Sequence, residues 1–227
     1  MGQEHTTLIA RRTFLAGSAA AGLLALPGCA SLGGYSLVDV VRRLLMASAD
    51  NAFAKLTVPG GFWDSAVARF ELPTLFGNRG GVVQSILMSD LFREKLQRQL
   101  NHFAEDGARR AAPVVTDAVR TIGVDNAAAI LAGGPTAATT MLRSQMGPAL
   151  INAMIPALSD TLRVANDPIV AQAITALAGV NLGDVAQAIA NRADNSIWYQ
   201  IGAEESAIRQ NPASVRDAVL SKALMGV

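Results

Sequence analysis

Apolar residues recur at three- and four-residue steps along most of this chain, and this helical period restricts the possible folds more than any other feature. The clearest series contain Val40, Val41, Leu44, Leu45, Leu96, Leu100 and Phe103. No segment alternates apolar and polar residues over several positions with β-branched enrichment, which is the pattern of a half-buried strand. The sequence therefore predicts an all-α protein.

Proline, glycine and capping residues divide the periodic sequence into a single bundle of about six to eight helices. Ser36 is a suitable N-cap for the first helix, and Asp125 is a suitable N-cap for a short helix near the middle. Pro148 and Pro156 are expected to kink or break a longer helical stretch. Asn211-Pro212 separates a last short helix from the one before it.

The first 28 residues have the organisation of an export signal. Arg11 and Arg12 supply a positively charged region, and an apolar segment follows at 15–26. Phe14 and Leu15 follow the arginine pair at the spacing of twin-arginine signals, which this segment resembles, so we favour that route over general secretion. The apolar segment is shorter than the about 20 residues that a membrane-spanning helix needs.

Cys29 is the chain's one cysteine, and it ends this segment. Leu26-Pro27-Gly28-Cys29 resembles the bacterial lipobox, which implies cleavage before Cys29 and acylation of its thiol. The alternative is ordinary signal-peptidase cleavage after Ala30. Neither Ala30 nor Ser31 is the aspartate associated with retention in the inner membrane. We therefore expect a lipid-anchored protein that faces the periplasm, at the outer membrane of a Gram-negative bacterium.

These signals divide the chain into a signal peptide at 1–28, a lipidated tether at 29–36 and a helical domain at 37–227. Removal of Arg11, Arg12 and Glu4 with the signal takes the 19 basic and 18 acidic residues to 17 of each. A net charge near zero argues against a nucleic-acid partner and against a polybasic membrane contact. The lipid on Cys29 is then the expected link to the membrane.

Few side chains suggest catalysis or metal binding. His102, Glu105 and Asp106 share a helix face at i, i+3 and i+4. A zinc site needs three or four converging ligands, so we interpret this face as solvated. Glu204 and Glu205 are adjacent and point about 100° apart, which prevents them from acting alone as an acid–base pair. We predict no catalytic residue, no metal site and no cofactor.

Two further segments have competing interpretations. Glu205 and Arg209 stand at i, i+4 and are expected to form an ion pair at a solvent-facing helix end. The segment 133–136, Gly-Gly-Pro-Thr, leads into a helix N-terminus, which can bind an anion. It lacks the Lys-Ser/Thr ending of a phosphate loop. We favour a helix stop, a turn and an N-cap for these four residues.

Methionine and leucine side chains are frequent in the segment 136–160. Those that define a candidate apolar groove are Met141, Met146, Leu150, Met154 and Leu158. At helical spacing such residues usually form a core, and we favour that interpretation. Methionine is also common on adaptable binding surfaces, so a groove for a lipid or another apolar molecule is the alternative.

Short motifs from residue 61 onward occur in the same order as in a bacterial family of unknown function. They are Gly61-Phe62, Phe70-Glu71-Leu72-Pro73, 101–105, Pro113, 125–134, 137–139, Arg143 and 204–212. On these residues the chain is similar to the DUF4197 family. It departs from the family at Met141-Leu142, where Tyr-Phe is frequent. The resemblance implies a helical, exported domain and implies no activity.

Taken together, these features favour a non-enzymatic envelope lipoprotein, anchored by acylated Cys29, that docks on an unknown envelope protein or has a structural role. One alternative is a carrier or sensor of a lipid or other apolar ligand in an interhelical groove. The other is an enzyme of unrecognised type.

Overall fold

The computed structural model describes residues 31–32, 35–71, 90–164 and 182–226. Helices make up most of these residues, which confirms the all-α prediction. The export-signal residues Arg11, Arg12, Phe14 and Leu15, together with Cys29, lie outside the described residues, as does Pro73 of the family motifs. Among the helices that are described, none is long and apolar enough to cross a membrane.

With residues 72–89 and 165–181 outside the described ranges, the described elements follow one another in chain order. They are β1 (Ser31–Leu32), β2 (Tyr35–Ser36), α1 (Leu37–Leu56), α2 (Gly61–Asp64), α5 (Asp90–Thr121), α6 (Ala127–Leu131), α7 (Ala137–Met146), α8 (Ala149–Val164), α10 (Leu182–Gln210), a 3-10 turn (Pro212–Ser214) and α11 (Ala218–Met225). The segment predicted as a tether thus includes a small antiparallel hairpin, in which Ser31 lies opposite Ser36.

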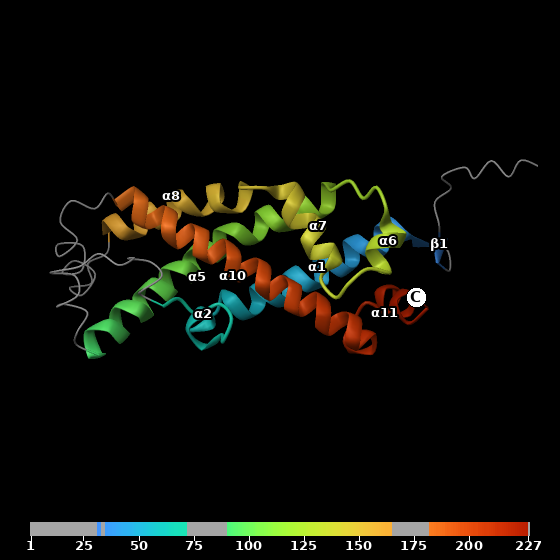
Figure 1. The fold of residues 1–227 in the computed structure, drawn as a ribbon, viewed down its shortest axis with the longest axis horizontal. Coiled ribbons are helices and arrows are strands. Elements are labelled where there is room, and N and C mark those ends of the chain that lie inside the picture. Colours follow the sequence, from blue (N-terminus) through green and yellow to red (C-terminus); the bar gives the residue numbers. More distant parts are fainter. Residues whose placement is uncertain (1–30, 33–34, 72–89, 165–181, 227) are drawn as a thin grey trace, which may run out of the picture.

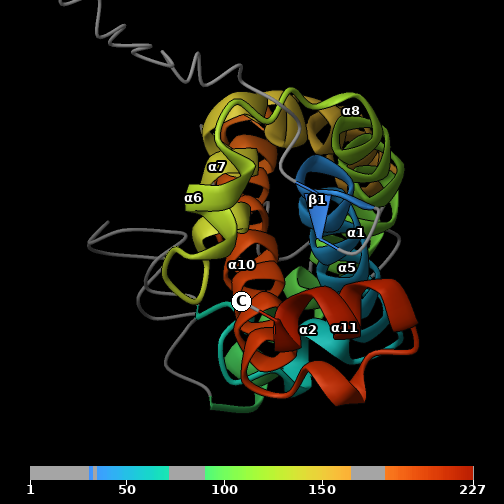
Figure 2. The same cartoon turned by 90° about the vertical axis from the view of Figure 1, so that its right-hand side faces the viewer.

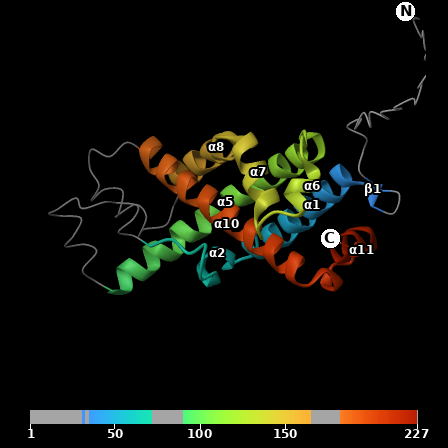
Figure 3. The ribbon, with the colours of Figure 1, turned by 45° about the vertical axis from the view of Figure 1, so that its right-hand side comes forward.

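Four long helices, α1, α5, α8 and α10, form the body of the molecule (Figure 1). α10 packs against α1 and α8, and α5 packs against α1 and α8, so the four helices enclose a shared core. The short helix α7 packs against α10, α6 packs against α1 and α7, and α11 lies beside α1 near the hairpin (Figures 2 and 3). The largest fully buried side chains are Phe62, Phe70, Leu44, Leu45, Leu56, Leu142, Leu150, Met154, Leu158, Ile189 and Ile197.

The predicted start of α1 is confirmed by its cap. The Ser36 hydroxyl accepts a hydrogen bond from the Val38 amide at 3.2 Å. The helix ends at Leu56, and the chain then turns sharply into α2. Gly61 makes this turn possible, because a Cβ there would lie 2.3 Å from the Lys55 carbonyl oxygen.

The predicted cap of the short middle helix is wrong by one residue. Asn126, rather than Asp125, is the N-cap of α6, and its side chain accepts the Ala129 amide at 3.1 Å. Asparagine and aspartate are nearly equal as N-caps, so the local sequence offered two adjacent candidates.

The two prolines of the middle segment behave differently. Pro148 lies at the break between α7 and α8, next to Gly147, which has a positive φ of 51°. Pro156 lies inside α8, which continues through it. Pro156 and Asn152 are both exposed, so water can bind the Asn152 carbonyl that the missing proline N–H leaves without its helical partner.

Candidate functional site

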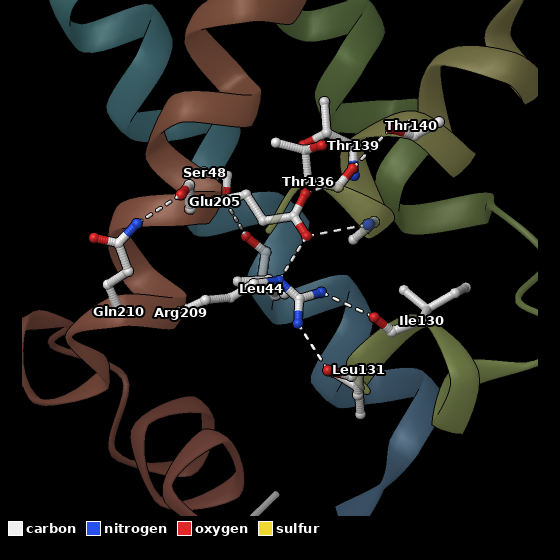
Figure 4. A network of polar contacts seen from close by, with 12 residues as sticks. Leu44, Ser48, Ile130, Leu131, Thr136, Thr139, Thr140, Glu205, Arg209 and Gln210 are labelled. Carbon is white, nitrogen blue, oxygen red and sulfur yellow. Dashed lines mark hydrogen bonds and ion pairs between the residues drawn. The ribbon is translucent and has the colours of Figure 1, made fainter. Parts of the chain in front are cut away.

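A buried carboxylate on α10 occupies the N-terminus of α7 (Figure 4). Glu205 Oε1 accepts the Ala138 amide at 3.0 Å, and Oε2 accepts the Thr139 amide at 2.7 Å and the Thr139 hydroxyl at 2.6 Å. Amides in the first turn of a helix have no acceptor in their own helix. Glu205 satisfies two of them and places its negative charge at the positive end of the helix dipole.

Arg209, one turn further along α10, connects the same carboxylate to α6. Its Nε donates to Glu205 Oε1 at 2.8 Å. Its Nη1 donates to the Leu131 carbonyl at 2.8 Å and its Nη2 to the Ile130 carbonyl at 3.0 Å. These carbonyls are at the end of α6, where intrahelical donors are missing. Glu205 and Arg209, here called the clamp, therefore hold the end of α6 and the start of α7 on α10 (Figure 4).

The predicted ion pair between Glu205 and Arg209 is confirmed, but the predicted solvent-facing helix end is wrong. Glu205 is 0% exposed, Glu204 is 7% exposed, and the Arg209 side chain is 11% exposed. The physical reason is that α7 packs against this side of α10 and the end of α6 binds Arg209, although both helices precede these residues by about 70 positions in the chain. Periodicity within one helix carries no information about such a cover.

The segment 133–136 also differs from expectation in one respect. Thr136 is the N-cap residue of α7, as predicted, but its side chain makes no capping hydrogen bond. The Glu205 carboxylate takes this role instead. The anion at this helix start is therefore a side chain of the same chain. Close packing is needed here, since a Cβ on Gly202 of α10 would lie 3.2 Å from Thr136 Cγ2.

Glu204 makes a separate contact with the C-terminal part of α1. Its Oε1 accepts Lys55 Nζ at 2.5 Å and Gln200 Nε2 at 2.7 Å. The Lys55 side chain is mostly exposed, so this ion pair lies at the edge of the core. The adjacent carboxylates Glu204 and Glu205 thus bind different neighbours, and they do not converge on a shared substrate position.

The three residues of the supposed solvated face on α5 have separate environments. Glu105 is buried, and its carboxylate accepts the Gly60 amide at 3.0 Å and lies 3.1 Å from His102 Nδ1. Asp106 pairs with Arg109. The interpretation as a solvated face is therefore wrong for Glu105, which holds the start of α2 against α5. Within the described ranges, no group of three or more metal-binding side chains is placed to hold an ion.

Asp194 is a buried carboxylate that the sequence did not single out. Burial raises its pKa, and hydrogen bonds from Trp198 and Arg143 oppose this rise. Trp198 Nε1 donates to Oδ1 at 2.9 Å, and Arg143 donates to Oδ2 at 3.2 Å. The i, i+4 spacing of Asp194 and Trp198 within an apolar helix was the available signal. The hydrogen bond from Arg143 to Asp194 is a second connection between α7 and α10.

The five residues of the candidate groove divide into two groups. Leu150, Met154 and Leu158 of α8 are fully buried, and Met154 and Leu158 lie close to Gly107 of α5. Met141 and Met146 are partly buried and pack on the edge of the core. Three of the five thus belong to the core, while a groove for an apolar ligand stays a prediction.

Comparison with known proteins gives one positive result. A family model described as a protein of unknown function, DUF4197, matches residues 31–224. The matched region begins well before Gly61 and includes the hairpin and α1. No curated protein and no solved structure matches the chain.

Proposed function

The chain belongs to the DUF4197 family, and from that premise we propose that it is a non-enzymatic lipoprotein of the bacterial cell envelope. Acylated Cys29 anchors it, and the helical domain faces the periplasm at the outer membrane. The domain acts by docking on a protein partner or as a structural element. It needs no cofactor for this role.

The observation that carries this proposal is the order of signals before the domain. A charged region with Arg11-Arg12, an apolar segment at 15–26 and a small residue before Cys29 follow one another without interruption. The family match starts at residue 31, two residues after the proposed acylation site. Cleavage before Cys29 would therefore leave the whole matched domain intact.

The buried carboxylates support a binding or structural role over catalysis. Glu105, Asp194, Glu204 and Glu205 each accept hydrogen bonds that connect helices or loops of the fold. A catalytic acid or base must reach the proton that it transfers in a bound substrate. These four groups are engaged in holding the bundle together.

Replacement of the anchoring cysteine tests the proposal. Cys29→Ala should move the protein from the membrane fraction of cells to the soluble periplasmic fraction, because a lipid chain is the proposed link. Ser31→Ala is the matched control and should leave the protein in the membrane. A Cys29→Ala protein that is processed and still sediments with membranes would contradict lipid anchoring.

The docking role has its own measurement. Affinity purification of the lipidated protein from native membranes, after mild crosslinking, should recover a specific envelope protein in constant ratio. The Cys29→Ala form should recover much less of it. Recovery of the protein alone, with a tightly bound apolar molecule, would contradict docking and favour the carrier.

A further inference from the structure

The link between Cys29 and the folded domain is very short. Ser31 pairs with Ser36, the N-cap of α1, so the hairpin turns the chain back on the start of the first long helix. Cys29 precedes Ser31 by two residues, which span at most about 7 Å. A lipid on Cys29 would therefore hold the start of α1 at the bilayer surface.

The end of the molecule beside this link is built from several elements. Figures 1 and 3 show β1, α11 and the C-terminal side of the chain at the same end, and Figure 2 views this end directly. Arg43 of α1 bonds Asp217, the N-cap of α11, at 2.7 Å. Arg42 donates to the Ile122 carbonyl, just after α5, at 2.8 Å. These contacts fix the surface relative to α1.

Two large apolar side chains are exposed at this end. Tyr35 of β2 is 45% exposed, and Met225 of α11 is 63% exposed. Tyrosine is enriched at membrane–water interfaces, where its ring contacts lipid and its hydroxyl contacts water. Nearby charges have both signs: Arg43 is paired with Asp217, and Arg216, Lys222 and Asp39 are exposed. The surface therefore suits apolar contact with lipid and does not form a polybasic patch.

We propose that this end of the domain rests on the bilayer, with Tyr35 and Met225 inserted into the headgroup region beside the lipid on Cys29. The inference rests on the proposed acylation. It deepens that proposal, because it gives the domain one orientation and directs the opposite end, where α5 begins, into the periplasm (Figure 1).

The test places a fluorescent reporter at each end of the mature protein. The Cys29 thiol of the unacylated chain is coupled to a maleimide phospholipid in phosphatidylcholine vesicles, with or without brominated acyl chains. Met225→Trp reports on the proposed contact. Leu91→Trp is the matched control, since Leu91 is 64% exposed near the start of α5. Emission of the unsubstituted protein, which contains Trp63 and Trp198, is subtracted.

Brominated lipid should reduce the added emission of Met225→Trp, because a side chain inserted about 5–10 Å into the boundary of headgroups and acyl chains approaches the bromine atoms, and it should leave Leu91→Trp unchanged. Tyr35→Trp is a second reporter and should behave like Met225→Trp. Equal emission of all three variants with and without bromine would overturn the orientation. Because chemical coupling replaces cellular acylation, this result does not depend on whether cells acylate Cys29. The mass of the native N-terminal peptide tests acylation separately.

Discussion

Glu205 and Arg209 meet at 2.8 Å inside the protein, and each also bonds the backbone of a helix other than their own. The carboxylate binds the first-turn amides of Ala138 and Thr139 in α7, and the guanidinium binds the last carbonyls of α6. The two charges of the clamp therefore balance each other, and each side chain also satisfies backbone groups at a helix end. This explains how two ionised side chains are accommodated in an interior that otherwise disfavours charge.

The clamp should be important for stability. Glu205→Gln leaves Arg209 buried without its counter-ion, so the free energy of unfolding should fall by about 3–5 kcal/mol. Glu94→Gln is the matched control, because Glu94 and Arg98 have the same i, i+4 spacing and are exposed. Its cost should stay below about 0.5 kcal/mol. Urea unfolding of both variants measures this difference, and equal losses would contradict the clamp.

The hydroxyl of Thr139 should contribute separately. Thr139→Val keeps the shape and the backbone amide but removes the hydroxyl that donates to Glu205. A hydrogen bond to a charged group contributes about 1.5–3 kcal/mol, and thermal unfolding should show a loss of that size. Thr140→Val next to it is the control, since Thr140 is exposed and bonds only the Thr136 carbonyl in the described structure. A larger loss at 140 than at 139 would refute this role.

Gly61 should not tolerate a side chain. A Cβ at this position would lie 2.3 Å from the Lys55 carbonyl oxygen and 2.8 Å from that of Leu56, so Gly61→Ala must move the backbone between α1 and α2. We expect a loss of more than about 2 kcal/mol in the free energy of unfolding. At Gly134 a Cβ meets nothing within 4 Å, so Gly134→Ala should be neutral or slightly stabilising. Calorimetry of the two variants compares them directly, and similar unfolding temperatures would show that the turn can relax.

Ionisation of Asp217 should contribute to the pH dependence of the free energy of unfolding. Burial opposes its ionisation. The hydrogen bond from Arg43 and those from the Leu220 and Val219 amides outweigh this effect and lower the pKa of Asp217 below its ordinary value of 3.8. A lowered folded-state pKa gives stability that is present above the unfolded pKa and lost as pH falls through the folded one.

Asp217→Asn isolates this contribution, since asparagine still caps α11 but does not ionise. The difference in unfolding free energy between the original protein and the variant should be constant near neutral pH. It should shrink once the pH falls below about 4. A difference that is unchanged down to pH 2 would show that the charge of Asp217 is unimportant. Asp39→Asn is a suitable control on the exposed side of α1.

Features that depend on neighbouring residues could be predicted from the sequence. The Ser36 cap, the start of α7 after Thr136 and the division at Asn211-Pro212 all rest on local backbone chemistry. The Glu205–Arg209 pair was predictable for the same reason, because i, i+4 side chains meet on any helix.

The burial of the clamp could not be predicted in this way. It depends on α7 packing against α10 and on the end of α6 lying within reach of Arg209, and the sequence of α10 does not specify these partners. Glu105 is a second example, since its acceptor role requires the Gly60 amide, 45 positions earlier in the chain. The sequence held one indication of the burial of Glu205 and Glu105. Each is a charged residue on an otherwise apolar helix face, with a glycine on the same segment or on the one that faces it.

The most direct test of the proposed function is the mass of the N-terminal peptide of the mature protein extracted from membranes. Lipid anchoring predicts a peptide that begins at Cys29 and carries a diacylglyceryl group on its sulfur. An unmodified peptide that begins at Ser31, as ordinary signal-peptidase cleavage would give, contradicts it.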